Sequence, residues 1–142
     1  SYQVKETTMK SYNGFTPAQR MKALKWLKEE WKSGRRVKGT SCDACGQSKG
    51  RIDAHSEDYS APYGDHTGKY TFCYRCHMMI HCRFKNKYAW HQYRNDIKSG
   101  KVFPPLWNDF PLFCEQSLTQ KGVGVPFEQR EEKERTVLDD ID

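Results

Sequence analysis

Two Cys-x-x-C pairs constrain this chain more than any other feature of its sequence. Each pair can present two thiolates from one tight turn, and four thiolates complete a tetrahedral Zn²⁺ site. Gly46, directly after the first pair, suits a turn that aims backbone amides at the sulfurs. The alternative, disulfide-bonded or free cysteines, fits this spacing less well. We therefore predict a structural zinc site, and its ligands are Cys42, Cys45, Cys73 and Cys76.

The sequence between and after the cysteines predicts the order strand, loop, strand and helix. Residues 51–55 and 70–73 have the apolar and aromatic content of short strands, and residues 75–84 carry the Met-Met-Ile run of a helix. His77 and His81 are four residues apart and therefore share one face of that helix. This is the spacing of two metal ligands, or of one ligand and its orienting neighbour.

These residues resemble a known nuclease family. The segments I-D-A-H-S-E-D-Y-S-A-P (52–62) and F-C-Y-R-C-H-M-M-I-H (72–81) are similar to zinc-bearing HNH endonucleases, the ββα-metal or His-Me finger nucleases of phages and mobile elements. The resemblance covers residues 42–82, because the zinc pairs, the Asp-Tyr-Ser-x-Pro loop and the Cys-His-x-x-x-His ending occur in the family's order. It implies an α+β fold, a small zinc-stapled ββα-metal finger flanked by helices. It also implies metal-dependent hydrolysis of DNA phosphodiester bonds.

Residue by residue, the resemblance assigns a catalytic divalent ion to His55 on the first strand and His81 on the helix, with His77 in a supporting role. At Ser56 the chain departs from the family, which usually has a second histidine there as the general base. Serine at its ordinary pKa does not take a proton from water near pH 7. The departure leaves an inactive HNH-derived module that binds DNA or a protein partner as the alternative to an endonuclease.

Several residues are candidates for the missing base. His66 and two tyrosines, Tyr59 and Tyr63, lie in the predicted loop 56–69. His55 itself is another candidate if Asp53, two residues earlier and on the same side of the strand, holds the metal with His81. Mg²⁺ or Mn²⁺ would stabilise the charged phosphate oxygens in either arrangement, with nickel or cobalt tolerated.

The distribution of charge favours a polyanionic partner. The net charge is +6, but residues 128–142 contain seven acidic and three basic side chains, so the rest of the chain is more basic than the total indicates. Basic side chains bind phosphates through counterion release, which favours a nucleic acid as the partner, and a merely soluble basic surface is the alternative. The resemblance to HNH endonucleases implies that this nucleic acid is double-stranded DNA. The candidate contacts flank the proposed site and are Arg35, Arg36, Lys38, Arg83, Lys85, Lys87 and Arg94.

The 142 residues predict a single domain with a modest core. We expect a flexible arm over 1–15, a zinc-stabilised domain over 16–114 and a polar, poorly ordered acidic tail over 115–142. Thr16, Pro17 and Gln19 form a capping box, and with Gly34 as the end signal it predicts a helix over 17–33. A second helix is expected over 88–99, with Tyr88 turned inward.

The remaining expectations concern partners and location. The aromatic segment 103–113 predicts a cover for the core or a contact with a protein partner. A homodimer is expected if both DNA strands are cut, because a single metal finger usually cuts one. No apolar stretch approaches the 18 or so residues that a membrane span needs, and no signal peptide is visible. Paired cysteines favour a reducing cytoplasm, and the resemblance to HNH endonucleases implies a bacterial or phage-infected cell.

Overall fold

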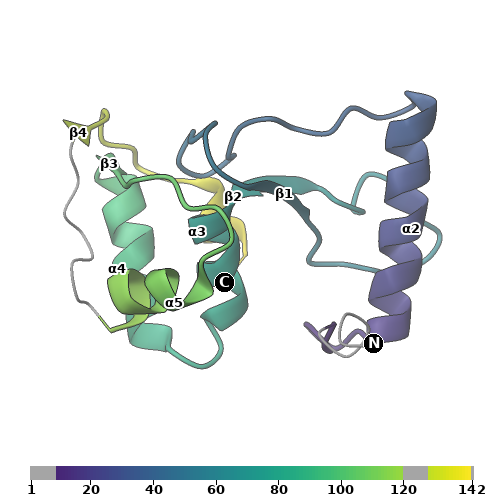
Figure 1. Cartoon of the computed structure of the whole chain (residues 1–142), viewed down its shortest axis with the longest axis horizontal. Helices are drawn as coiled ribbons and strands as arrows, with labels where there is room; N and C mark the ends of the chain where they lie inside the picture. Colours follow the sequence, from purple (N-terminus) through teal and green to yellow (C-terminus); the bar gives the residue numbers. More distant parts are fainter. Residues whose placement is uncertain (1–8, 120–127, 142) are drawn as a thin grey trace. The chain divides into compact units, whose positions relative to one another are not determined.

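The computed structural model describes residues 9–119 and 128–141. They form an α+β structure of two compact units: the described residues of 1–38 and 54–70 make the first unit, and those of 39–53 and 71–142 make the second unit. The helices, labelled in Figure 1, are α2 (Pro17–Ser33), α3 (Tyr74–Cys82), α4 (Lys87–Lys98) and α5 (Phe110–Phe113). The strands are β1 (Ile52–His55), β2 (Tyr70–Cys73), β3 (Lys101–Val102) and β4 (Glu128–Gln129).

Helix α2 dominates the first unit and confirms the capping signals of the sequence. The Thr16 hydroxyl accepts a hydrogen bond from the Gln19 amide, and the Gln19 side chain returns one to the Thr16 amide. Gly34 ends the helix in the left-handed conformation. Ala23 and Leu27 are its buried residues.

The loop that packs on α2 has a defined structure. Gly68 has a φ of +60°, and a Cβ atom there would collide with the Leu27 side chain. The Trp26 and Tyr63 rings lie 5.7 Å apart, so Tyr63 packs against α2. The Arg36 guanidinium donates a hydrogen bond to the Gly64 carbonyl at 3.2 Å.

The strands of the predicted metal finger are close to their expected positions. β1 and β2 form a two-stranded sheet, and β2 covers 70–73 as predicted. β2 continues into α3, and Cys73 is the N-cap residue of that helix. α3 starts one residue earlier and ends two residues earlier than the predicted 75–84.

Helices α3 and α4 build the core of the second unit (Figure 1). Its fully buried apolar side chains include Phe72, Met79, Ile80, Trp90, Ile97 and Phe113. The predicted inward orientation of Tyr88 is wrong, since this residue is 72% exposed and Tyr93 is buried instead. Tyr88 lies in the first turn of α4, where it points away from the apolar stripe of the helix. No helix in the described parts of the chain is both long enough and apolar enough to span a membrane.

The structure of the C-terminal segment differs from the polar tail expected over 115–142. A π-helical turn covers Cys114–Leu118, β4 pairs with β3 in antiparallel register, and a 3-10 turn covers Val137–Asp140. Leu138 is completely buried. This apolar residue holds the acidic segment on the second unit, a role that its polar surroundings in the sequence do not signal. Residues 120–127 and 142 of the expected tail lie outside the described residues.

The N-terminal arm expected over 1–15 also differs where it is described. Tyr12 is buried in the first unit and forms a backbone bridge with Phe15. Residues 1–8 lie outside the described part of the chain.

Candidate metal centres

The four cysteines of the two pairs meet in the second unit. Their Sγ atoms all lie within 4.8 Å of one another, and the Cys45 and Cys73 sulfurs are 3.7 Å apart. Tetrahedral zinc with Zn–S bonds of about 2.3 Å places its sulfur ligands about 3.8 Å apart. The four cysteines are free thiols, and no disulfide joins them in this structure. The cluster is therefore positioned to bind a structural metal ion such as zinc.

Backbone amides support the sulfurs, as expected for metal-binding turns. The Cys45 amide donates to Cys42 Sγ at 3.4 Å, and the Gln47 amide donates to Cys45 Sγ at 3.4 Å. Gly46 takes the left-handed conformation, with a φ of +81°, that this turn requires. The second pair repeats the pattern at the start of α3, where the Cys76 amide lies 3.5 Å from Cys73 Sγ.

The four thiols share one buried space, and their pKa values diverge as a result. Hydrogen bonds from the neighbouring thiols, Cys45 first, lower the pKa of Cys42. Burial, followed by hydrogen bonds with Cys42, Cys45 and Cys73, raises the pKa of Cys76. Four adjacent thiolates repel one another, so full deprotonation needs a cation among them. This electrostatic requirement is the one that a bound divalent metal satisfies.

Tyr93 of α4 adds a contact to the cluster that sequence reasoning missed. Its hydroxyl lies 2.9 Å from Cys76 Sγ, and its ring stacks on Phe103 with centroids 5.9 Å apart. Burial raises the pKa of Tyr93 well above its usual range, so the phenol keeps its proton and can donate it to a thiolate. Such outer contacts orient ligands and tune the metal.

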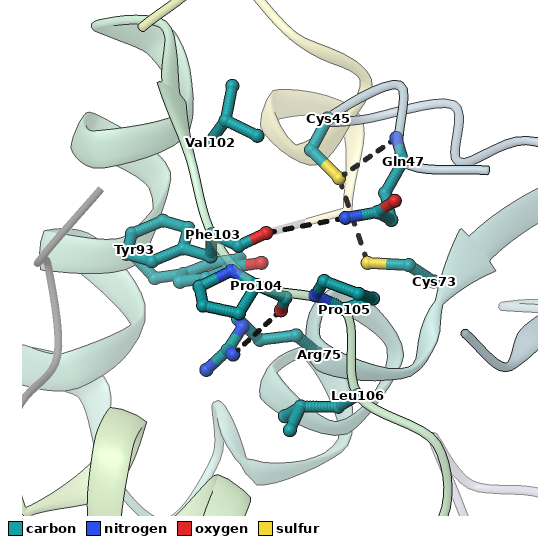
Figure 2. A pocket seen from close by; sticks show the side chains of 10 residues that line it. All are labelled: Cys45, Gln47, Cys73, Arg75, Tyr93, Val102, Phe103, Pro104, Pro105 and Leu106. Atoms are coloured by element: carbon teal, nitrogen blue, oxygen red, sulfur yellow. Dashed lines mark hydrogen bonds between the residues drawn. The ribbon is translucent and has the colours of Figure 1, made fainter. Parts of the chain in front are cut away.

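The segment 103–106 closes the cluster from one side, as Figure 2 shows. The Gln47 amide group donates to the Phe103 carbonyl at 3.3 Å, and the Arg75 guanidinium donates to the Pro104 carbonyl at 3.0 Å. The cavity between these groups and the cysteines measures about 10 Å³. A single water needs a space of roughly this size, so this cavity is too small for a substrate. The cysteine site is structural in character.

A second group of possible ligands lies on α3 and β1, also in the second unit. His77 Nδ1 is 3.2 Å from Asp53 Oδ2, and His77 Nε2 is 3.1 Å from His81 Nε2. A carboxylate that accepts from Nδ1–H leaves the Nε2 lone pair of His77 available. Two imidazole nitrogens at 3.1 Å suit a shared proton or a shared cation, since each metal–nitrogen bond would be about 2.0–2.1 Å.

Asp53 is held in its charged form. Burial raises its pKa, but the hydrogen bonds from His77 and Arg51 outweigh this effect and lower the pKa overall. Arg51 Nε lies 3.0 Å from the carboxylate, and the same guanidinium donates to Asn108 Oδ1 at 2.7 Å. The carboxylate is therefore ionised, oriented and next to a histidine.

The first unit places His55, the predicted strand ligand, in a buried polar cluster. His55 Nε2 lies 2.5 Å from Glu57 Oε2 and 3.5 Å from the Tyr12 hydroxyl. The Tyr12 hydroxyl also donates to Glu57. Glu57 was not identified from the sequence as a partner of His55, although a carboxylate two residues after a histidine is close enough to contact it. Nothing in the sequence indicated Tyr12, which lies far from both along the chain.

The other residues considered for the general base have contacts of their own in the first unit. Ser56 is buried, and its hydroxyl accepts a hydrogen bond from the Gly68 amide at 2.7 Å. Tyr59 packs on Phe15 under the Arg20 guanidinium, and burial raises its pKa. His66 Nε2 lies 2.7 Å from the Ser60 carbonyl. The hydrogen bond of Ser56 therefore fixes the loop. The raised pKa of Tyr59 keeps its phenol protonated to a higher pH than usual.

Among the predicted DNA contacts of the first unit, Arg35 and Lys38 are exposed and Arg36 is half-buried, and all three contact neighbouring side chains. Arg35 forms an ion pair with Glu30 at 2.7 Å. The Arg36 guanidinium and the Lys38 ammonium lie over the rings of Trp26 and Trp31, 5.6 and 5.3 Å from their centroids.

The predicted contacts of the second unit divide into two kinds. Lys85 and Lys87 are exposed. Arg83 is only 4% exposed and donates to the Ile80 carbonyl, so its guanidinium does not face solvent. Arg94 pairs with Asp139 of the C-terminal segment at 3.2 Å. Charge in the sequence alone did not distinguish these environments.

No family model, curated protein or solved structure matches the chain.

Proposed function

We propose that this protein is a metal-dependent endonuclease of the HNH type that hydrolyses DNA phosphodiester bonds. The observation that carries the proposal is the Asp53–His77–His81 chain of contacts, which joins an ionised carboxylate to two imidazole nitrogens 3.1 Å apart. This proposal adds a catalytic ion to the structural zinc of the cysteine cluster. Such an ion would stabilise the charge on phosphate oxygens during hydrolysis.

The contacts support a division of labour between these residues. Nε2 of His77 and Nε2 of His81 would hold the ion, and Asp53 would orient His77 through its Nδ1–H. Nitrogen donors favour Mn²⁺, Co²⁺, Ni²⁺ or Zn²⁺ over Mg²⁺, so Mn²⁺ is the first ion to test with Mg²⁺ as its comparison. His55 stays a predicted ligand and is tested by a variant of its own.

A cutting assay tests the proposal. The purified protein is incubated with supercoiled plasmid DNA and Mn²⁺ or Mg²⁺, beside His81→Ala and the matched control His91→Ala on the exposed side of α4. We expect metal-dependent nicking that His81→Ala and His55→Ala abolish and that His91→Ala retains. Nicking that persists unchanged in His81→Ala would contradict the site.

A second function is favoured by the environment of Ser56. Its hydroxyl accepts from the Gly68 amide, and this loop contact does not make it a base. The alternative is a DNA-binding metal module without cutting activity. Binding of duplex DNA that weakens steeply with salt, together with no nicking under any metal, would identify this alternative.

A further inference from the structure

The turn between α3 and α4 presents aromatic and basic side chains together. Its sequence, residues 83–88, is Arg-Phe-Lys-Asn-Lys-Tyr. Phe84 is 53% exposed and Tyr88 is 72% exposed, although aromatic side chains usually lose most of their surface on folding. Lys85 and Lys87 are exposed beside them. We call residues 83–88 the aromatic turn.

The backbone of the aromatic turn is fixed from both sides. The amides of Lys85 and Asn86 donate to the Cys82 carbonyl at 3.0 and 3.1 Å, which continues the end of α3. The Asn86 side chain then accepts from the Ala89 amide at 3.0 Å and caps α4. The exposed rings therefore stand on a rigid support, which lowers the entropy lost when a ligand binds.

Arg83 supports Phe84 from inside the protein. Its guanidinium carbon lies 4.2 Å from the centroid of the Phe84 ring, and its Nη1 donates to the Ile80 carbonyl at 2.9 Å. Because Arg83 is almost fully buried, it cannot bind a phosphate itself, but it holds the Phe84 ring at the surface.

We infer that the aromatic turn binds unpaired bases of a single-stranded nucleic acid. Phe84 and Tyr88 would each stack on a base, and Lys85 and Lys87 would contact the adjoining phosphates. Both lysines lie between the two aromatic residues in the sequence, whereas the cores of protein–protein interfaces are depleted in lysine. The inference rests on the nucleic-acid partner of the proposed function and deepens it, because it assigns an unpaired strand to this turn.

Binding to matched DNA forms tests the inference. Dissociation constants are measured by fluorescence anisotropy with a labelled oligothymidine and with a labelled duplex. The zinc-loaded protein is used in a buffer without added Mn²⁺ or Mg²⁺, and gel electrophoresis of each oligonucleotide checks that it stays intact. We expect Phe84→Leu and Tyr88→Leu each to weaken single-strand binding roughly 5- to 100-fold, in line with the loss of one stacked base. Duplex binding should change less than about twofold, since paired bases are not available for stacking.

Two controls separate stacking from charge and from misfolding. Trp107→Leu removes another exposed ring of the second unit and should leave both affinities unchanged. Lys85→Ala with Lys87→Ala should weaken both DNA forms and reduce the salt dependence of binding. Each variant must keep the zinc content and thermal midpoint of the original protein.

The outcomes distinguish this inference from the proposed function. Duplex binding or cutting by the original protein, without measurable single-strand binding, would overturn the inference alone. Single-strand binding that Phe84→Leu and Tyr88→Leu both leave unchanged would also overturn it. No binding to either DNA form would overturn the inference and the proposed function together, as would capture of a peptide ligand in place of DNA.

Discussion

The contact between Tyr93 and the cysteine cluster leads to a sharp prediction about metal affinity. Replacing Tyr93 by phenylalanine removes one hydroxyl and keeps the ring that stacks on Phe103. The lost interaction is the hydrogen bond to Cys76 Sγ at 2.9 Å. We expect the Tyr93→Phe protein to fold and to bind zinc more weakly than the original protein.

The magnitude follows from the charge of the acceptor. A hydrogen bond to a charged group contributes roughly 1.5–3 kcal/mol, and each 1.4 kcal/mol corresponds to about a tenfold change in a binding constant. Cys76 is a thiolate when it binds metal, so the expected loss in zinc affinity is roughly 10- to 100-fold. The lower end applies if the phenyl ring shifts slightly and the cavity beside it admits a water.

Competition with a chromophoric zinc chelator measures this loss directly. Tyr88→Phe is the matched control, because it makes the same chemical change on the same helix at a residue that is 72% exposed. Its zinc affinity should equal that of the original protein. If Tyr93→Phe binds zinc as tightly as Tyr88→Phe does, the hydroxyl does not stabilise the thiolate and the reasoning is wrong.

Three further predictions concern stability. Removing metal with a chelator, or changing Cys73→Ser, should abolish the cooperative thermal transition of the second unit, because the cluster without metal leaves crowded buried thiols. A transition that circular dichroism shows to be unchanged would contradict a structural metal. Leu138→Ala should lower the free energy of unfolding by about 2–5 kcal/mol in urea titrations, because Leu138 is buried. Glu132→Ala at an exposed position should change this free energy by less than about 0.5 kcal/mol. Equal effects of the two substitutions would refute the packing of the C-terminal segment. Burial raises the pKa of Asp139, but its hydrogen bonds with the Thr136 amide and Lys98, and the nearby Arg94, lower this pKa overall. The ionised carboxylate therefore stabilises the fold at pH values above its unfolded pKa. This stabilisation is lost as the pH falls through the folded pKa. Asp139→Asn should therefore lower the thermal midpoint at pH 7 and change it little near pH 2.

Sequence signals of short range predicted much of the fold. The Thr16 capping box and Gly34 gave the bounds of α2 because a helix end depends on residues within one turn of it. The β2 strand and the approximate bounds of β1, α3 and α4 followed from local periodicity in the same way. The resemblance to HNH nucleases stays a prediction, because it depends on the roles of His55 and His81, which only activity can test.

The sequence by itself determined the cysteine cluster, since two Cys-x-x-C turns need only meet to make a four-sulfur site. Only the tertiary structure decided which residues contact this cluster and which charged or apolar side chains are buried elsewhere. Tyr93 reaches Cys76, Arg83 turns inward beneath Phe84, and Leu138 anchors an acidic segment. Each of these outcomes depends on contacts between residues distant in the sequence or on which side of an element faces the core. Residue type and local spacing do not encode either one, because burial is a property of the packed chain as a whole.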